Sequence, residues 1–192
     1  MRGTSPYDVS KICAEMVARS YHATYAIPVG VVRCGNLYGG GDLHLDRIVP
    51  GTIRALLSGE RPVVRSDGRA VREYLYADDA ARGYMILAEA ADRPGIAGEA
   101  FNLSGEQPAS VLEVVETIGR LAGRTDLAPR VLGESSPENP VMSLTALKAQ
   151  KMLGWSPETA LETGLARTIA WYREAWRAGT PGPVEAALSR QA

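Results

Sequence analysis

The stretch Ser5-Pro6-Tyr7-Asp8-Val9-Ser10-Lys11 opens a segment with helical periodicity, and the interpretation of the whole chain starts from it. Apolar residues recur at helical spacing between Pro6 and Tyr25, which predicts a long helix: Val9, Ile12, Cys13, Met16 and Val17. Tyr7 and Lys11 are four residues apart and therefore share one helix face. The β-branched run from Val29 to Val32 predicts a buried strand. Helix followed by strand is the repeating unit of a parallel sheet, so an α/β fold is predicted.

The bulk composition is that of a globular protein and excludes several classes of partner. The chain has 192 residues, of which 45% are hydrophobic and 22% charged, enough to bury one substantial core or two small ones. Its 21 basic and 22 acidic residues leave a net charge of -1, so no global positive field favours nucleic acid or an anionic membrane. An anionic ligand would have to be held by local arginines.

Cysteine and histidine usage predicts neither a disulfide nor a metal site. Cys13 and Cys34 are not a close pair, and His22 and His44 do not group with them at any metal-ligand spacing. No span of about 18–20 uncharged apolar residues is long enough to cross a bilayer, and the first residues contain no apolar run. A cytoplasmic protein with free thiols and no membrane partner is expected.

Further elements are predicted from periodicity, turn residues and caps. The clearest helix runs from Val111 to Leu121, because Ser110 and Glu113 have the spacing of a capping box. Asp78 or Asp79 is predicted to cap a helix that ends near residue 91. Other helices are expected at 48–57, 144–153 and 160–176, and short strands at 61–65, 74–76 and 100–103. Residues 123–143 are expected to form an irregular surface segment.

Tyr7 and Lys11 form the pattern with the most chemical meaning. A phenol has an ordinary pKa of about 10 and is a poor base at neutral pH, but a lysine ammonium on the same helix face stabilises the phenolate by charge. The alternative is a half-buried tyrosine beside a solvated lysine, a pair that occurs by chance in many helices. The segments that follow the helix decide between these interpretations.

Two downstream segments supply that context. Arg33-Cys34-Gly35-Asn36-Leu37-Tyr38-Gly39 follows the predicted strand, and Arg72-Glu73-Tyr74-Leu75-Tyr76-Ala77-Asp78 comes later. With the Tyr-x-x-x-Lys helix they resemble the extended short-chain dehydrogenase/reductase superfamily, and the resemblance extends from Ser5 to about Trp176. Within it, the chain is most similar to CDP-glucose 4,6-dehydratases, on the residues Arg47-Ile48-Val49-Pro50-Gly51-Thr52-Ile53-Arg54 and Val64-Arg65-Ser66-Asp67-Gly68.

The resemblance implies a fold and a reaction. The expected fold is the C-terminal part of a Rossmann-type enzyme, with residues 1–37 a remnant of the NAD-binding domain, 38–176 the substrate-binding region and 177–192 a flexible tail. In such enzymes the tyrosine removes the proton of the sugar 4-hydroxyl while hydride passes to NAD, and the lysine binds the nicotinamide ribose. Elimination of water across C5 and C6 then gives a 4-keto-6-deoxy sugar. Tyr7 and Lys11 would be the catalytic and cofactor-binding pair.

The resemblance also assigns ligand contacts. Arg33 is expected at the cofactor. A second set is expected to bind the nucleotide sugar: Asn36, Arg47, Arg65 and Arg72. Arg72 would bind the diphosphate, since a guanidinium donates two parallel hydrogen bonds to phosphate oxygens. The alternative for these residues is an ordinary structural or surface position. Packing is expected of three aromatic residues: Tyr74, Tyr76 and Trp155.

The glycine pattern sets an expectation about the cofactor. The sequence contains no Gly-x-x-Gly-x-x-Gly phosphate loop, and Gly39-Gly40-Gly41 resembles the family's substrate loop instead. The isolated chain is therefore expected to bind NAD poorly and to lack turnover. Its expected partners are a nucleotide sugar and either a complementary N-terminal half or further copies of itself. The alternatives are a fragment of an NDP-sugar 4-epimerase or 4-reductase, and a noncatalytic nucleotide-sugar binding module.

Overall fold

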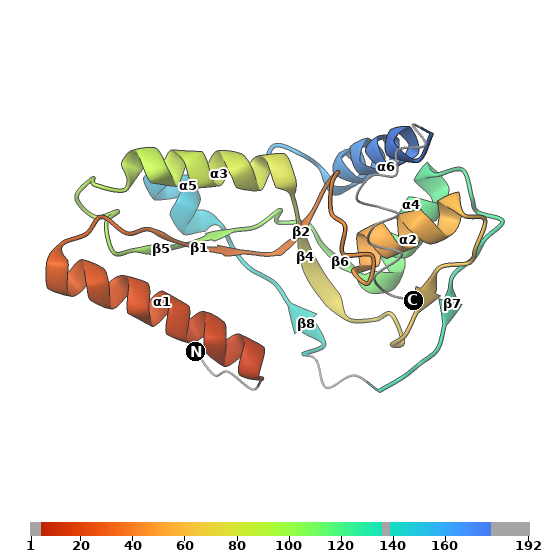
Figure 1. Cartoon of the computed structure of the whole chain (residues 1–192), viewed down its shortest axis with the longest axis horizontal. Coiled ribbons are helices and arrows are strands. Elements are labelled where there is room, and N and C mark those ends of the chain that lie inside the picture. The colour runs from red at the N-terminus through yellow and green to blue at the C-terminus, as the bar shows by residue number, and fades with distance from the viewer. Residues whose placement is uncertain (1–4, 136–138, 178–192) are drawn as a thin grey trace.

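The computed structural model describes residues 5–135 and 139–177, and Figure 1 shows them as two packed ends joined by the strands β2 and β4. The helices are α1 (Pro6–Tyr25), α2 (Ile48–Leu57), α3 (Ala77–Ala90), α4 (Val111–Leu121), α5 (Leu147–Leu153) and α6 (Leu161–Arg177). The strands are β1 (Val31–Cys34), β2 (Asn36–Tyr38), β3 (Val63–Val64), β4 (Val71–Tyr76), β5 (Ala100–Leu103), β6 (Pro108–Ser110), β7 (Arg130–Val131) and β8 (Val141–Met142). This is the α/β architecture that the sequence predicts.

One end of the molecule is a layered α/β unit. β1 and β5 pair in parallel, with Val31 beside Ala100 and Cys34 beside Leu103. The chain between them passes through α3, as parallel pairing requires. Helices α3 and α5 cover one face of this pair, and α1 lies on the other side (Figure 1). The core of this end includes Leu75, Leu87, Phe101, Leu103, Ala149 and Trp155.

The other end packs three helices around a mixed sheet. β4 pairs in parallel with β2, with Asn36 beside Tyr74, and antiparallel with β6. β8 adds a further parallel pairing to β4, and β3 pairs separately with β7. Helices α2, α4 and α6 close a second core that includes Tyr38, Val49, Ile53, Tyr74, Ile118, Leu165 and Ile169. Both ends therefore have a hydrophobic core of their own.

Gly35 carries the chain directly from β1 into β2 and so from one end to the other. A Cβ at this position would lie 2.9 Å from the backbone oxygen of Glu73. Glycine therefore lets the chain pass close to β4. Arg33 in β1 and Asn36 in β2 therefore lie on two strands that follow each other directly through a bend at Gly35.

The helix predictions are confirmed with shifts of up to three residues at their boundaries. The Ser110 hydroxyl accepts a hydrogen bond from the Glu113 N–H (3.2 Å), and the Glu113 carboxylate accepts one from the Ser110 N–H (2.8 Å). α4 therefore begins at the predicted capping box. α5 begins at Leu147, later than predicted, and ends at Gly154 with a left-handed φ of 66°.

The predicted cap of α3 is wrong. The N-cap of this helix is Tyr76, and no side chain caps it. Asp79 instead lies buried inside the first turn, where its carboxylate accepts hydrogen bonds from the Glu158 N–H (3.2 Å), the Thr159 N–H (2.9 Å) and Arg82 (3.1 Å). Burial alone would raise the pKa of Asp79, but these hydrogen bonds outweigh it and lower the pKa. The residue ties α3 to the segment before α6.

Three strand predictions are corrected in their boundaries or extent. The strand predicted at 29–32 runs from Val31 to Cys34, because its pairing with β5 starts at Val31. The strand predicted at 61–65 is reduced to β3, and the one predicted at 74–76 extends back to Val71 in β4. The segment 123–143, predicted to be irregular, contributes β7 and β8. The predicted tail, apart from residue 177, lies outside the described residues.

α1 turns its apolar side away from the rest of the molecule. Glu15 is the buried residue of this helix, whereas Met16 is 63% and Val17 55% exposed. Val9 and Tyr21 are exposed as well, so an outward apolar face of α1 is formed by Val9, Met16, Val17 and Tyr21. Among the described helices, none has the length and apolar content to cross a membrane.

Candidate functional site

Tyr7 and Lys11 lie together near the start of α1. The helix begins here because the Ser5 hydroxyl accepts a hydrogen bond from the Asp8 N–H (3.1 Å) and Pro6 occupies the first turn. The Lys11 Nζ lies 5.4 Å from the centre of the Tyr7 ring, close enough for a cation–π contact. Tyr7 is 69% exposed, so its phenol is open to a ligand. The structure brings this predicted pair together, while its catalytic role stays a prediction.

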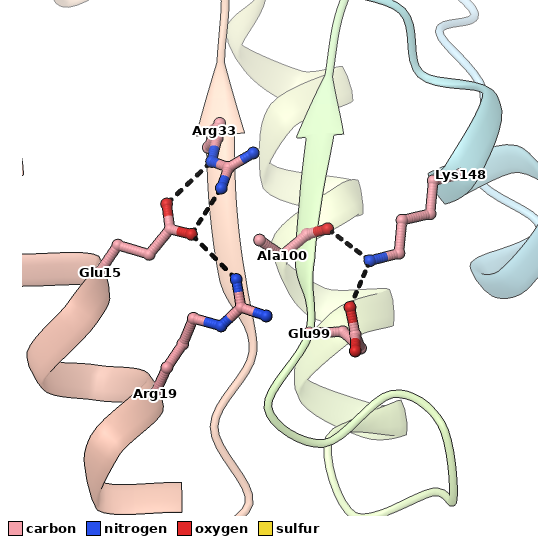
Figure 2. A network of polar contacts seen from close by, with 6 residues as sticks. All are labelled: Glu15, Arg19, Arg33, Glu99, Ala100 and Lys148. Atoms are coloured by element: carbon pink, nitrogen blue, oxygen red, sulfur yellow. Dashed lines mark hydrogen bonds and ion pairs between the residues drawn. The ribbon is translucent and has the colours of Figure 1, made fainter. Parts of the chain in front are cut away.

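Arg33 contacts α1 through Glu15. Its Nε and Nη2 donate to the two carboxylate oxygens at 2.8 and 2.5 Å, and Arg19 adds a third hydrogen bond at 3.3 Å (Figure 2). The hydrogen bond from Arg33 is the main cause that lowers the pKa of Glu15. Sequence reasoning missed this contact because the two residues are 18 positions apart. In the structure Arg33 holds α1 against β1. Its predicted contact with the cofactor stays a prediction.

The glycine loop after β2 packs against α6. A Cβ at Gly40 would lie 2.5 Å from the Trp171 ring, and Gly41 has a φ of 83°. The Tyr172 hydroxyl donates to the Asp42 carbonyl oxygen, and burial raises the pKa of Tyr172 above its ordinary value. These glycines therefore serve close packing between the loop and α6. Asn36, which precedes this loop, is exposed on β2.

The Arg47 and Arg65 side chains predicted to bind substrate line one groove, which has a volume of about 690 Å³. Arg54 on α2 and Arg61 before β3 line the same groove. Sequence reasoning missed both, because an arginine on a helix or in a turn is ordinarily a solvated surface residue. Three acidic residues also line it: Asp46, Glu60 and Glu134. The groove is built from α2, from the loops around it and from the segments on either side of β3.

The arginines of this groove differ in how they are held. Arg47 donates to the Asp42 carboxylate (3.1 Å), whose other oxygen accepts the His44 N–H (3.0 Å). Arg61 donates to the Ala128 carbonyl oxygen at 2.8 Å. The Arg54 Nε is buried and has no hydrogen-bond partner among residues 5–135 and 139–177. Two of the four guanidiniums are thus positioned by protein oxygens.

Arg72 lies on β4, away from the residues that line the groove. It is buried and donates to the carbonyl oxygens of Val71 (2.8 Å) and Asn139 (2.9 Å). The structure therefore places Arg72 where it supports the segment before β8. Its predicted contact with a diphosphate stays a prediction.

The three aromatic residues expected to pack do so. Tyr74, Tyr76 and Trp155 are all buried. Trp155 Nε1 donates to the Asp79 carbonyl oxygen at 3.0 Å. Burial raises the pKa of Tyr74 to about 12, and its hydroxyl has no hydrogen-bond partner. Within the described ranges, no cluster of three or more His, Cys, Asp or Glu side chains is arranged to hold a metal ion.

Known proteins resemble this chain both in sequence and in fold. Residues 1–104 match the model of the NAD dependent epimerase/dehydratase family. Over 174 residues the chain is 31% identical to dTDP-glucose 4,6-dehydratase of Streptomyces griseus, a match that covers 91% of this chain and 52% of that protein. The chain spans about half the length of the curated relatives it matches.

Two solved structures show the same architecture. dTDP-glucose 4,6-dehydratase DesIV of Streptomyces venezuelae, determined with NAD bound, is 31% identical and superposes with a TM-score of 0.82, covering 94% of this chain and 55% of that one. UDP-glucose 4-epimerase of Thermotoga maritima, determined with UDP-glucose, is 26% identical with a TM-score of 0.82, covering 91% and 55%. The fold is that of the extended short-chain dehydrogenase/reductases, and the matched share agrees with a C-terminal portion. The chain belongs to the NAD dependent epimerase/dehydratase family.

Proposed function

We propose that this chain binds a nucleoside diphosphate sugar in the arginine-lined groove and contributes the Tyr7–Lys11 pair to a 4,6-dehydratase-like reaction. The observation that carries the proposal is the gathering of four arginines in one groove of a chain whose net charge is -1. Guanidinium groups bind phosphate oxygens through paired, charge-assisted hydrogen bonds. Their concentration here favours a diphosphate ligand over a neutral one.

The sugar nucleotide that we propose is CDP-glucose. Two relatives named above are a dTDP-glucose 4,6-dehydratase and a UDP-glucose 4-epimerase, which supports the class of nucleoside diphosphate sugars. The choice of CDP-glucose within that class rests on the residues 47–54 and 64–68, which resemble CDP-glucose 4,6-dehydratases. Both segments contribute arginines to the groove. In this assignment Asn36 and Arg72 complete the substrate contacts.

Tyr7 would act as the base that takes the proton from the sugar 4-hydroxyl. Lys11 would stabilise the Tyr7 phenolate that accepts this proton and would bind a ribose hydroxyl of the cofactor, because its ammonium lies beside the phenol on an open helix face. NAD supplies the hydride acceptor when it is bound. The hydroxyl and ammonium fit the nicotinamide ribose end of this cofactor, whereas Gly40, packed against Trp171, does not fit its phosphates. A part other than the described residues would hold the phosphates.

The outward apolar face of α1 supports a partner for this end of the molecule. Val9, Met16, Val17 and Tyr21 are exposed on one side of the helix, and contiguous apolar surface of this kind marks an interaction site. A complementary dinucleotide-binding half, or further copies of the chain, would cover it. Turnover by the isolated chain is not expected.

The second candidate is a noncatalytic nucleotide-sugar binding module. It is favoured by one observation: the lining residues of the groove lie between positions 45 and 135 and do not include Tyr7 or Lys11. A 4-epimerase or 4-reductase remains the alternative for the reaction, because hydride and proton transfer at C4 beside a Tyr–Lys pair, as oxidation or as reduction, is the step that these activities share with a dehydratase.

Isothermal titration calorimetry tests these proposals. The chain is titrated with CDP-glucose, dTDP-glucose and UDP-glucose, each with and without NAD. Binding with a preference for CDP-glucose is the expected result, and failure to bind any of the three would overturn the proposal. CDP-glucose binding with no NAD binding would favour the module. A 4-keto product formed by the chain alone with NAD would show that no complementary half is required.

A further inference from the structure

Two of the four groove arginines have guanidiniums that are not engaged by the described part of the chain. Arg47 is held by Asp42 and Arg61 by the Ala128 carbonyl oxygen. Within residues 5–135 and 139–177, the side chains of Arg54 and Arg65 donate no hydrogen bond and form no ion pair. These two are therefore the groove's available cations.

Arg54 is the more unusual of the two because part of its guanidinium is removed from water. It projects from α2, a helix with six buried residues, and the residue itself is half-buried. Its Nε is fully buried without an acceptor. Buried donors in folded proteins nearly always have a partner, because an unmade hydrogen bond leaves the loss of hydration uncompensated. Residues 5–135 and 139–177 supply no acceptor for this Nε, and Arg54 itself lines the groove, which points to a ligand of the groove as a partner for its guanidinium.

The chemistry of that acceptor follows from the surroundings. Glu60 and Glu134 line the groove but form no ion pair with Arg54 within the described ranges. A guanidinium without a carboxylate partner interacts more strongly with an anion than with a neutral carbonyl, since charge-assisted hydrogen bonds are about twice as strong as neutral ones. Arg65, after β3, supplies a second unpaired guanidinium on the same groove. A phosphate group with several oxygens meets both requirements.

We propose that Arg54, together with Arg65, binds phosphate oxygens of the groove's ligand. The inference deepens the proposed function, on which it rests, by adding a residue that the resemblance to known families does not assign. Arg54 is a binding residue for the diphosphate, distinct from Arg72, whose guanidinium donates to the carbonyl oxygens of Val71 and Asn139.

The test compares Arg54→Met with Arg93→Met, each measured for folding and for binding. Methionine keeps the length of the Arg54 stem, and Arg93 is an exposed arginine outside the groove. The probes are inorganic pyrophosphate, CDP-glucose and cytidine. We expect Arg54→Met to weaken pyrophosphate and CDP-glucose by about tenfold or more, with cytidine affinity and the thermal midpoint not lowered. Arg93→Met should match the parent throughout.

Each other outcome has a defined meaning. If Arg54→Met binds both phosphate probes as tightly as the parent, Arg54 is not a ligand residue, and the proposed function stands on the parent's CDP-glucose binding. A third outcome is that the parent binds pyrophosphate but no nucleotide sugar, and that Arg54→Met no longer binds pyrophosphate. This result would support an anion site at Arg54 and would overturn the proposed function. A large drop in the thermal midpoint of Arg54→Met, with Arg54→Lys restoring the fold but not changing affinity, would make Arg54 structural. If Arg54→Met and Arg93→Met lose the same affinity for the phosphate probes, the effect comes from the change in net charge, and Arg54 is not a specific binding residue.

Discussion

The Arg33 guanidinium donates two hydrogen bonds to the Glu15 carboxylate and thereby joins α1 to β1 across the molecule (Figure 2). Arg19 contacts the same carboxylate from one turn further along α1. From α5, Lys148 makes a matching contact at the start of the paired strand β5 by donating to Glu99 (2.6 Å) and to the Ala100 carbonyl oxygen (2.9 Å). Helices α1 and α5 are thus each attached to the β1–β5 pair by an ion pair.

Replacing Glu15 with glutamine should destabilise the protein in a pH-dependent way. At pH 7 the free energy of unfolding should fall by about 1 kcal/mol, because Arg33 is partly exposed and solvent screens the pair. The pKa of Glu15 is below its ordinary 4.5, so the stabilisation is complete above that value and is lost as pH falls through the lower native pKa. Urea unfolding across this range should show the two proteins converging in acid. A constant difference, or one equal to that of the exposed Glu116→Gln control, would contradict the assignment.

Gly40→Ala should strain the contact between the glycine loop and α6. The added methyl group would lie 2.5 Å from the Trp171 ring, and overpacking of this kind costs about 1–3 kcal/mol of unfolding free energy. Trp171→Leu in the same chain should relieve most of that cost, which a double-mutant cycle measures directly. Gly119→Ala is the matched control, since its Cβ meets its nearest atom at 3.9 Å. Strictly additive effects of the two substitutions would show that the loop does not press on the ring.

Tyr7→Phe should abolish turnover without preventing ligand binding. The substitution removes the proposed base and leaves the ring and its contact with Lys11 in place, so a rate loss of about 10²–10⁴-fold is expected. The reaction is followed in the chain complemented with a dinucleotide-binding half, while calorimetry follows CDP-glucose affinity, which should stay within a small factor. Tyr21→Phe on the same helix serves as the control. Full turnover by the Tyr7 variant would remove it from catalysis.

Arg72→Ala should weaken nucleotide-sugar binding and also loosen the segment before β8. A buried charge contact with a diphosphate would be worth about 2–5 kcal/mol of affinity. The same change removes the donor to the Asn139 carbonyl oxygen, so the unfolding free energy is measured alongside CDP-glucose affinity. Unchanged affinity in a folded variant would leave Arg72 a purely structural residue.

Local patterns in the sequence predicted the helices well because several helices carry recognisable capping or terminating residues at their ends. Ser110 and Glu113 form the capping box that starts α4, and Gly154 adopts the left-handed conformation that ends α5. Ser5 and Pro6 mark the start of α1 in the same way. These signals lie within a few residues of the boundary that they determine, so no tertiary information is needed to use them.

The errors arise where a residue acts across the chain. Asp79 was expected to cap its own helix, but its partners Glu158 and Thr159 are about 80 positions away. The short strands β7 and β8 exist through their pairing with β3 and β4 and carry too few residues to show periodicity. The same reason applies to the site: the sequence named Arg47 and Arg65 but not Arg54 and Arg61, because the convergence of these arginines on one groove depends on how the chain packs around α2.

The attachment of α1 determines how tightly Tyr7 and Lys11, the proposed catalytic pair, are held. Its buried side chain is Glu15, and most of its apolar surface faces outward, so little burial opposes its detachment as a unit. A partner that covers Val9, Met16 and Val17 would lower the population of molecules in which α1 is detached. By mass action it would keep Tyr7 and Lys11 in their positions beside β1. Catalytic competence would then rise with the concentration of the covering partner, which makes assembly itself a control on the reaction.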